Sequence, residues 1–334
     1  MNECDLRQLE ITLPFPPRPH LSGARAQRHA QHWATRFGLL ADERAHRRFE
    51  SLGYGRFASY WCSGASFADL VLLAEWITLF FIFDDLQDAA VSEQRAGEYD
   101  SLRYRALDVI HRRPGSGAAE SPVIAALENL CDRTYPRQTP SAARRFALNL
   151  EIWLMGHARE NAFRASSTVP GPAEYPRLRR DACTVLPTVD LAEIAERAIV
   201  PDALYFGPAY QEIIATTADL MCWINDLHSL AVETETADPI NLVTVLRSHR
   251  RLSLPEAVDA VRAMIADRVA DNLAAVAAIR PEMDELQLSP QVRNAVLRCV
   301  RDCQSATAGM ELWDRTDTVR FLGAAPARHL SSHC

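Results

Sequence analysis

The chain has 334 residues, of which 48% are hydrophobic, and a formal net charge of −7 with a pI of about 5.8. This length and apolar content predict one large domain or two small ones, and the negative charge argues against a nucleic-acid partner. The sequence contains no Lys, so Arg supplies every fixed positive side-chain charge. The eight Cys form no CxxC pair, which predicts reduced thiols in a cytoplasmic protein and no zinc site.

The first distinct feature along the chain is the proline-rich stretch ITLPFPPRPH at 11–20. Because closely spaced prolines cannot continue a helix, we expect residues 1–20 to form an extended arm that lies on a helical body. The longest apolar run, ADLVLLAEWITLFFIF, spans Ala68 to Phe83 and contains Glu75. It is shorter than the roughly 20 residues that cross a bilayer. The run therefore predicts a buried core helix and no membrane span.

Several helix starts are marked by Ser or Thr followed directly by Pro, in ESPVIAAL at 120, QTPSAARRFAL at 138 and QLSPQVRNAVL at 287. Such pairs supply the N-cap oxygen and a first-turn residue that needs no hydrogen-bond donor. Apolar residues at helical spacing in 209–227 and 255–279 predict two further long helices.

The connections between the predicted helices are short. HRRPGSGAAES at 111–121 is expected to be a loop, and residues 323–334 a flexible tail. We find no strand alternation, no repeat and no linker long enough to separate two domains. The sequence therefore predicts that residues 1–334 form one all-α domain of about ten helices.

The core run ends in FFIFDDLQD, which places Asp84, Asp85 and Asp88 within five positions. On a helix, residues four apart share a face, so these like charges repel, and the apolar approach predicts that they are buried. Buried carboxylates need cations or protons. Because no basic residue occurs between Leu70 and Ser92, the cation must be a bound metal or an Arg from a distant helix. Three ordinary surface aspartates are the alternative.

A second polar stripe ends another apolar helix, in WINDLHSLAVE at 223–233. Asn225, Ser229 and Glu233 recur at four-residue spacing and form a row of oxygens roughly 12 Å long. Asn and Ser are poor choices for a helix interior unless their oxygens have partners. Hard oxygen ligands on short side chains favour Mg²⁺, although an ordinary polar face is the alternative.

Mg²⁺ seldom sits in an all-protein cage and commonly shares a phosphate ligand, so basic residues should lie opposite the carboxylates. Arg is suited to this task because its planar fork holds phosphate oxygens in pairs. The segments EYPRLRRD at 174–181 and WDRTDTVRF at 313–321 supply the candidates, which are Arg177, Arg179, Arg180, Arg315 and Arg320.

Together these motifs resemble those of bacterial class I terpene cyclases, most of all the sesquiterpene cyclases. The family has a DDxxD motif followed about 140 residues later by NDxxSxxxE, as in this chain. YPRLRR is similar to the family's diphosphate-sensor segment, WDRTDTVRF to its C-terminal element ending in Arg-Tyr, and LPFPPRPH to its N-terminal arm. The resemblance covers nearly the whole chain and implies a class I terpenoid synthase-like helical bundle around a central cavity.

The resemblance also implies a catalytic set that holds three Mg²⁺ ions and the diphosphate of the substrate. Asp84 matches the aspartate that binds two of the ions. The ligands of the third ion are implied to be Asn225, Ser229 and Glu233. Arg179 matches the diphosphate sensor, and Arg320 matches the Arg of the C-terminal pair.

Other positions are implied to surround the substrate. Asp85 and Asp88 match positions that pair with Arg when the site closes. Ala182 and Cys183 lie where the family places linker and effector residues beside the ionising carbon. The implied walls of the cavity are Phe57, Phe80, Phe81 and Trp313.

The chain departs from the family pattern at three positions. Val232 stands where Lys or Arg is common, Phe321 replaces the Tyr of the Arg-Tyr pair, and Ala182 replaces an acidic residue or Thr. The loss of the tyrosine hydroxyl removes a donor to diphosphate. The metal ligands are intact, so the resemblance still implies an active enzyme.

The function implied by the resemblance is ionisation and cyclisation of a linear isoprenoid diphosphate. The size of the chain and the two Phe before the aspartates favour farnesyl diphosphate as the substrate. A diterpene cyclase acting on geranylgeranyl diphosphate and a chain-elongating prenyl diphosphate synthase are the near alternatives. The elongating enzymes use two aspartate-rich motifs and Lys contacts, which this chain lacks. A metal-dependent phosphohydrolase and a non-catalytic helical scaffold are alternatives from other classes. Dimers are common in the family, so the resemblance is compatible with a homodimer.

Overall fold

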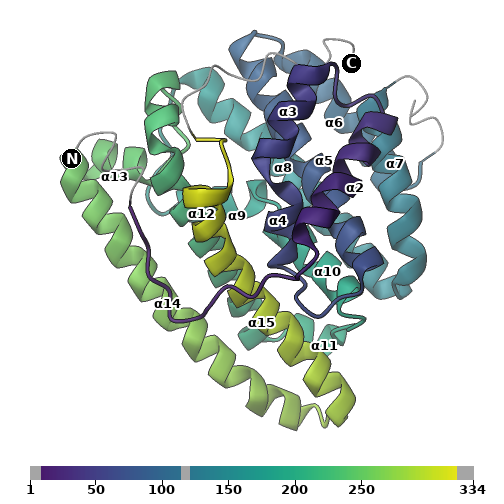
Figure 1. Ribbon diagram of the computed structural model, residues 1–334. Helices are drawn as coiled ribbons and strands as arrows, with labels where there is room; N and C mark the ends of the chain where they lie inside the picture. The colour runs from purple at the N-terminus through teal and green to yellow at the C-terminus, as the bar shows by residue number, and fades with distance from the viewer. Residues whose placement is uncertain (1–8, 114–120, 322–334) are drawn as a thin grey trace.

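The computed structural model describes residues 9–113 and 121–321 (Figure 1). About 77% of the chain is helical and no strand occurs in these two segments, so the all-α prediction is confirmed. Residues 111–113 lie outside any helix, in the expected loop. The rest of that loop before Ser121 and the predicted tail at 323–334 lie outside the described residues.

The helices of the N-terminal half are α2 (Gly23–Arg36), α3 (Glu43–Leu52), α4 (Tyr54–Ser59), α5 (Phe67–Ser92), α6 (Ala96–Ile110), α7 (Pro122–Thr134), the short η2 (Tyr135–Arg137) and α8 (Pro140–Ser166). The helices of the C-terminal half are α9 (Tyr175–Ala182), α10 (Val185–Ala195), α11 (Asp202–Tyr205), α12 (Pro208–Thr236), α13 (Leu242–Arg250), α14 (Leu254–Glu285), α15 (Pro290–Leu312) and the π-helical turn η3 (Trp313–Asp317).

Three helix starts follow the predicted Ser/Thr-Pro pairs. The side chains of Ser121, Thr139 and Ser289 accept hydrogen bonds from backbone N–H groups in the first turns of α7, α8 and α15. Pro occupies the first helical position in each case, where its missing N–H costs nothing. These starts were predictable because capping is decided by neighbouring residues alone.

Helix α5 forms the centre of the bundle. It packs against α2, α4, α6, α7, α8 and α10, which surround it on all sides. Its sequence is apolar all round rather than on one stripe, as a helix enclosed by other helices requires. The prediction of a buried core helix is confirmed, because Leu70, Ala74 and Leu79 have no exposed surface.

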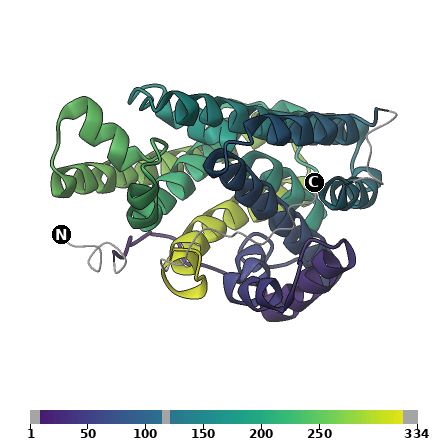
Figure 2. The same ribbon diagram turned by 90° about the horizontal axis from the view of Figure 1, so that it is seen from above.

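Helix α12 joins the two hydrophobic clusters of the protein. Its first half, including Tyr210 and Ile213, packs in the cluster around α5, whereas Leu220 and Leu227 pack in a second cluster with α13 and α14. Figures 1 and 2 show α2–α4 on one side of the molecule and α13–α14 on the opposite side. Because one continuous helix belongs to both clusters, we infer that the two sides form a single domain.

The described part of the N-terminal arm lies along α15. Residues 9–20 contain no helix and cross the molecule as the dark strand-like trace in Figure 1. The Ile11 N–H donates to Glu311 at 3.4 Å, and the Arg18 N–H donates to Ser305 Oγ at 2.8 Å. Phe15 is buried in the second cluster, so the arm is anchored by both polar and apolar contacts.

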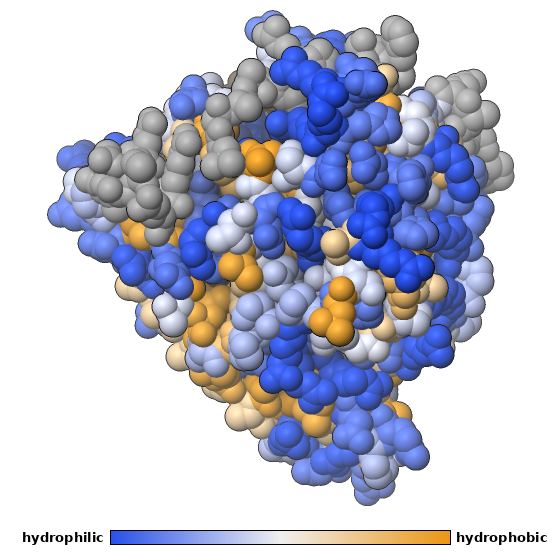
Figure 3. Space-filling view, viewed as in Figure 1, coloured by the Kyte–Doolittle hydropathy of each residue, from blue (hydrophilic) through white to orange (hydrophobic). Residues whose placement is uncertain are grey.

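The face of the molecule seen in Figure 3 is mostly hydrophilic, with apolar residues gathered at the lower left along α14 and α15. Leu273 of α14 and Leu286, which follows that helix, are more than a third exposed. No helix in the described parts of the chain is long and apolar enough to cross a membrane.

The contact between α8 and α9 depends on a glycine. A Cβ added at Gly156 of α8 would lie 2.5 Å from the backbone of Ala182, at the end of α9. Gly156→Ala should therefore lower the melting temperature, at a cost of about 1–3 kcal/mol for overpacking. Gly97→Ala in α6 is the matched control, since its Cβ would meet no atom within 4 Å. Equal thermal melts for the two variants would contradict this close packing.

Candidate active site

The carboxylates of α5 lie where the helix leaves the core. Phe83 is fully buried, whereas the side chains of Asp84 and Asp88 are 45% and 56% exposed. Asp85 is 16% exposed. The prediction that all three carboxylates are buried is therefore wrong for two of them, because α5 continues to Ser92 and emerges from its ring of helices there.

The positive charge opposite these carboxylates comes from distant segments. Arg320 donates from Nη1 to Asp85 Oδ1 at 2.7 Å and from Nη2 to Asp84 Oδ2. Arg164 of α8 lies 3.9 Å from Asp88 Oδ1. Burial raises the pKa of the Asp85 carboxyl above its ordinary value, although the Arg320 charge opposes this effect. Arg320 and Arg164 thus supply part of the positive charge that the α5 carboxylates need from other segments.

The second set of oxygens lies on α12. Asn225 donates from Nδ2 to Asp314 Oδ2 at 3.4 Å, and Glu233 accepts from Asn241 Nδ2 at 2.7 Å. Ser229 is 2% exposed, and its Oγ has no hydrogen-bond partner in the described structure. A buried hydroxyl without a partner is costly, and a bound cation would supply one.

These oxygens suit Mg²⁺ as part of a shared site rather than a closed cage. No group of three or more His, Cys, Asp or Glu within residues 9–113 and 121–321 is placed to hold a metal ion. The α12 stripe instead offers amide, hydroxyl and carboxylate oxygens, which are hard ligands. Mg²⁺ keeps several waters and takes phosphate oxygens, so an incomplete protein ligand set fits this ion.

One segment at the end of the chain contacts both sets of oxygens. Asp314 accepts from Asn225 of α12, and Arg320 donates to Asp84 and Asp85 of α5. Asp314 and Arg320 lie only six positions apart. The two motifs, about 140 residues apart in sequence, therefore flank the same short stretch of chain.

Arg179 of α9 lies beside the α12 stripe. Its Nη2 donates to Asp226 Oδ1 at 3.1 Å, and its Nη1 donates to Glu160 Oε1 at 3.3 Å. Asp226 also accepts from the Tyr175 hydroxyl and from the Leu242 N–H. The Nε of Arg179 is buried without a partner in the described structure. The guanidinium is therefore held in place while one donor stays unused.

The other candidate arginines have partners elsewhere. Arg180 donates to both oxygens of Asp219 at 2.6 Å, and Arg315 donates to Glu311 at 2.9 Å. The side chain of Arg177 is 84% exposed. Of the five arginines considered from sequence, the structure brings only Arg179 and Arg320 to the oxygen-bearing helix faces.

The predicted wall residues fall into two aromatic groups. Phe81 stacks on Tyr54, with ring centroids 4.5 Å apart, and lies 5.4 Å from Trp313. Phe57 also stacks on Trp313, at 5.1 Å, and the Arg320 guanidinium lies 5.0 Å from the Phe81 ring. This first group is therefore adjacent to the carboxylates.

Phe80 belongs to the second aromatic group, which lies on a different face of α5. It packs against Trp153 and Trp76, with centroids 5.0 Å and 5.5 Å away, and is 3% exposed. Adjacent helical residues point about 100° apart, so the two phenylalanines cannot share one group. Phe81 is thus the better placed of the two to face a substrate at the carboxylates.

The linker and effector positions, Ala182 and Cys183, lie at the C-terminal end of α9. Ala182 is 6% exposed, and its backbone lies close to Gly156 of α8. Cys183 begins the break before α10, and its thiol lies 3.4 Å from the Arg180 carbonyl oxygen. Nothing in the structure explains the departures from the family pattern at Ala182, Val232 and Phe321.

Several residues at the site were not singled out from the sequence, namely Tyr54, Glu160, Arg164, Asp226, Asn241 and Asp314. Asp226 follows Asn225 directly, and its position inside the motif was a signal that could have been used. The others act through contacts between distant helices, which periodicity does not reveal.

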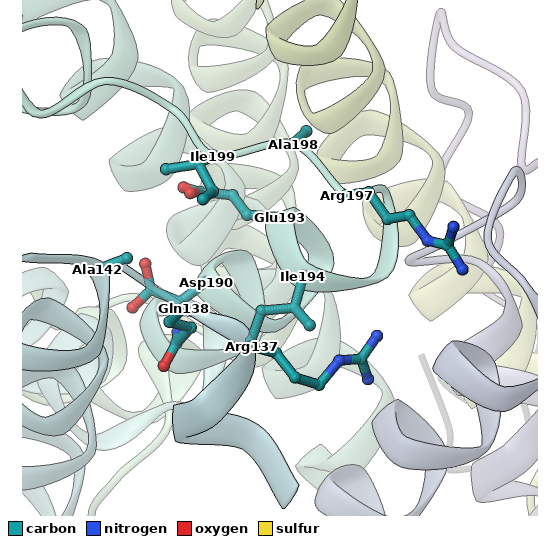
Figure 4. A pocket seen from close by; sticks show the side chains of 9 residues that line it. All are labelled: Arg137, Gln138, Ala142, Asp190, Glu193, Ile194, Arg197, Ala198 and Ile199. Atoms are coloured by element: carbon teal, nitrogen blue, oxygen red, sulfur yellow. The ribbon is translucent and has the colours of Figure 1, made fainter. Parts of the chain in front are cut away.

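A cavity of about 370 Å³ lies far from these residues, between η2, the start of α8 and the end of α10 (Figure 4). It adjoins a buried ion-pair network in which Arg145 contacts Asp190 at 2.8 Å and Glu193 at 2.7 Å. Arg137 of its lining pairs with Asp69, at the opposite end of α5 from Asp84 and roughly 22 Å away along the helix. The cavity is therefore not part of the candidate site.

Comparison with known proteins identifies the family. Residues 75–271 match the model of terpene synthase family 2, C-terminal metal binding. Pristinol synthase of Streptomyces pristinaespiralis is 26% identical over 310 residues, which cover 92% of this chain and 83% of that protein. A Kitasatospora setae corvol ether synthase, named as farnesyl diphosphate cyclising, is 26% identical over 93% of this chain and 94% of its own.

Comparison with solved structures finds the same fold in other terpene synthases. The crystal structure of α-eudesmol synthase superposes with a TM-score of 0.83 at 24% identity, covering 92% of this chain and 99% of that one. This likeness shows the fold. Since the family model matches more than half of the chain and includes the metal-binding region, the chain belongs to the terpene synthases, a family of class I terpene cyclases that depend on a divalent metal.

Arg179→Lys should lower kcat/KM about 10²-fold although it keeps the charge, because an ammonium cannot reproduce the geometry of the fork. Arg177→Lys is the matched control from the same helix, because the Arg177 side chain is largely in solvent. Steady-state diphosphate release measures both variants. Equal losses in the two would mean that Arg179 does not contact the substrate.

Phe81→Leu should keep diphosphate release but shift the products towards acyclic or early-quenched ones, because it alters the aromatic group beside the carboxylates. Phe80→Leu should instead lower the melting temperature, by about 1–3 kcal/mol of lost packing, and change the products less. Gas chromatography of the products beside thermal melts separates the two effects. A product shift confined to Phe80→Leu would place the substrate on the other aromatic group.

Proposed function

We propose that this chain is a Mg²⁺-dependent sesquiterpene cyclase that ionises farnesyl diphosphate, cyclises the resulting cation to a hydrocarbon or alcohol, and releases diphosphate. The observation that carries the proposal is the single segment from Asp314 to Arg320 that contacts both oxygen-bearing motifs. Two ligand sets that meet around one segment can act on one diphosphate group.

The proposed metal ligands are Asp84 on α5 and, on α12, Asn225, Ser229 and Glu233. Three Mg²⁺ ions bound there would act as Lewis acids that neutralise the leaving diphosphate. The unpartnered Ser229 hydroxyl and the half-exposed Asp84 carboxylate both support this assignment. Asp84 and Asp85 now pair with Arg320, so Asp84 can offer both of its oxygens to ions only when Arg320 gives up that contact.

Arg320 and Arg179 are proposed to bind the oxygens of the diphosphate. Arg320 would exchange Asp84 for phosphate, whereas Arg179 can add a bond from its unused Nε while it keeps Asp226 and Glu160. Substrate binding therefore frees the carboxylate that is needed for metal binding. This exchange couples occupation of the site to its assembly.

The aromatic group of Phe57, Phe81 and Trp313 is proposed to shield the reacting chain from water. Water would quench the allylic cation, so the site must exclude it during the reaction. Aromatic faces attract cations by about 0.5–2 kcal/mol each, which favours the ionised chain over free solution. Cys183 and the neighbouring break after α9 would lie beside the ionising carbon.

The fifteen-carbon substrate is supported by the relatives, because the Kitasatospora protein is named for cyclisation of farnesyl diphosphate. A twenty-carbon substrate is the alternative within the family. Chain elongation is disfavoured by the absence of Lys and by the single DDxxD motif. Cytoplasmic location remains a prediction from the cysteine pattern, and homodimer formation remains a prediction from the family resemblance.

The metal ligands give the sharpest test. Asp84→Ala, Asn225→Ala and Glu233→Ala should each abolish formation of terpene from farnesyl diphosphate in Mg²⁺ while the far-ultraviolet circular dichroism stays unchanged. Each substitution removes one oxygen from the ligand set without opening the core. Chelation of Mg²⁺ by EDTA should abolish turnover of the unaltered protein, and added Mg²⁺ should restore it.

The matched control is Glu235→Ala, two positions from Glu233 on the exposed side of α12. It should keep full activity. Gas chromatography with mass spectrometry detects the organic products. Near-normal turnover in all three ligand variants would overturn the site assignment, and a longer prenyl diphosphate as the product would overturn the proposed reaction.

A further inference from the structure

Asp314 is a buried carboxylate that the proposed chemistry does not yet use. It lies in η3, the π-helical turn that follows α15, and is 6% exposed. Its Oδ2 accepts from Asn225, and its Oδ1 has no hydrogen-bond partner in the described structure. No ion pair to Asp314 occurs among residues 9–113 and 121–321, so its contact with Asn225 is the side-chain hydrogen bond that the described structure gives this carboxyl group.

The neighbours of Asp314 hold it firmly in this place. Trp313 is fully buried, and its Nε1 donates to the Leu52 carbonyl oxygen at 2.9 Å. The Thr318 N–H closes the π turn on the Trp313 carbonyl oxygen at 3.0 Å. π turns are rare and are frequent at functional sites. These contacts fix the turn that directs the Asp314 side chain at α12.

The contact has a chemical consequence for Asn225. An amide group presents an oxygen on one side and an NH₂ on the other, and the two orientations are nearly equal in shape. In the structure the NH₂ of Asn225 faces Asp314, since its Nδ2 lies 3.4 Å from Asp314 Oδ2. The amide oxygen must then point away from Asp314. Cations bind that oxygen and not the NH₂.

We propose that Asp314 is a positioning residue that orients the Asn225 amide so that its oxygen faces the bound metal ion. This inference rests on the proposed function, in which Asn225 is a metal ligand. Without Asp314 the amide could turn its NH₂ towards the ion, and the fraction of molecules ready to bind would fall. The same contact ties the metal-binding stripe to the segment that carries Arg320.

The inference is tested by Mg²⁺ binding in the presence of inorganic diphosphate, measured as the Mg²⁺ concentration that produces half of the rise in melting temperature. Asp314→Leu removes the acceptor but fills the space, and should raise this concentration about 10- to 100-fold, as substitutions behind a metal ligand do. Asp314→Asn can still accept through its own oxygen and should have a smaller effect. Asp317→Asn, in the same turn but 29% exposed, is the control and should leave the value unchanged.

The melting temperature without ligands separates positioning from support of the fold. Replacing a buried carboxyl group that has one unpaired oxygen by an apolar side chain should leave Asp314→Leu at least as stable as the unaltered chain. A less stable variant with an unchanged Mg²⁺ requirement would show a purely structural role and overturn the inference. If Asp314→Leu does not fold, Asp314→Asn decides, and an unchanged Mg²⁺ requirement in that variant would also overturn it.

Failure of the proposed function gives a different result. Glu233→Ala should weaken the Mg²⁺-dependent shift whether or not Asp314 positions Asn225. If Glu233→Ala weakens the shift but neither Asp314 variant does, only the positioning role is wrong. If the unaltered chain shows no Mg²⁺-dependent shift with diphosphate, both the function and the positioning role are contradicted.

Discussion

Negative charge and oxygen ligands are concentrated in the C-terminal parts of α5 and α12, and the segment from Asp314 to Arg320 contacts both helices. Arg320 contacts the α5 carboxylates, while Asp314 contacts Asn225 on α12. Like charges on α5 would otherwise repel each other. The pairing with Arg320 relieves that repulsion while the site contains no substrate, and the same guanidinium is the natural partner of an arriving diphosphate.

The buried Asp226 on α12 makes more and shorter polar contacts than the exposed Asp88 on α5. Asp226 is fully buried and accepts from Arg179, Tyr175 and the Leu242 N–H, so the middle of α12 is fixed to both α9 and the start of α13. Asp88, in contrast, is more than half exposed and meets Arg164 only at 3.9 Å. We infer that closure of the site changes contacts at Asp84 and Asp88, while α9 and α12 serve as a fixed frame.

The fold was largely predictable because its signals are local. Helix starts at Ser121, Thr139 and Ser289 follow from residues that cap their own first turns. The aspartate motif and the α12 stripe were also visible, because helical spacing alone puts their side chains on one face. The exposure of Asp84 was mispredicted, since the sequence does not tell where a long helix leaves its ring of neighbours.

The tertiary contacts of the site were not predictable from one sequence. The pairs Asn225–Asp314 and Asp88–Arg164 join segments whose meeting depends on the packing of the whole bundle. Phe80 and Phe81 were treated alike, although the 100° rotation between adjacent helical residues already implied that they face different neighbours. Sequence patterns thus indicated which side chains supply ligand oxygens. The packing of the bundle showed which residues contact those side chains.

The central claim is that α5 and α12 hold divalent ions around one diphosphate. The most direct measurement is anomalous X-ray scattering from crystals of the protein grown with inorganic diphosphate and Mn²⁺, which takes the same oxygen ligands as Mg²⁺. The account predicts anomalous peaks within bonding distance of Asp84 and of the oxygens of Asn225, Ser229 and Glu233, with diphosphate between them and Arg320 moved from Asp84 to the phosphate. Ordered diphosphate and Mn²⁺ at any other place, with these oxygens uncoordinated, would contradict it.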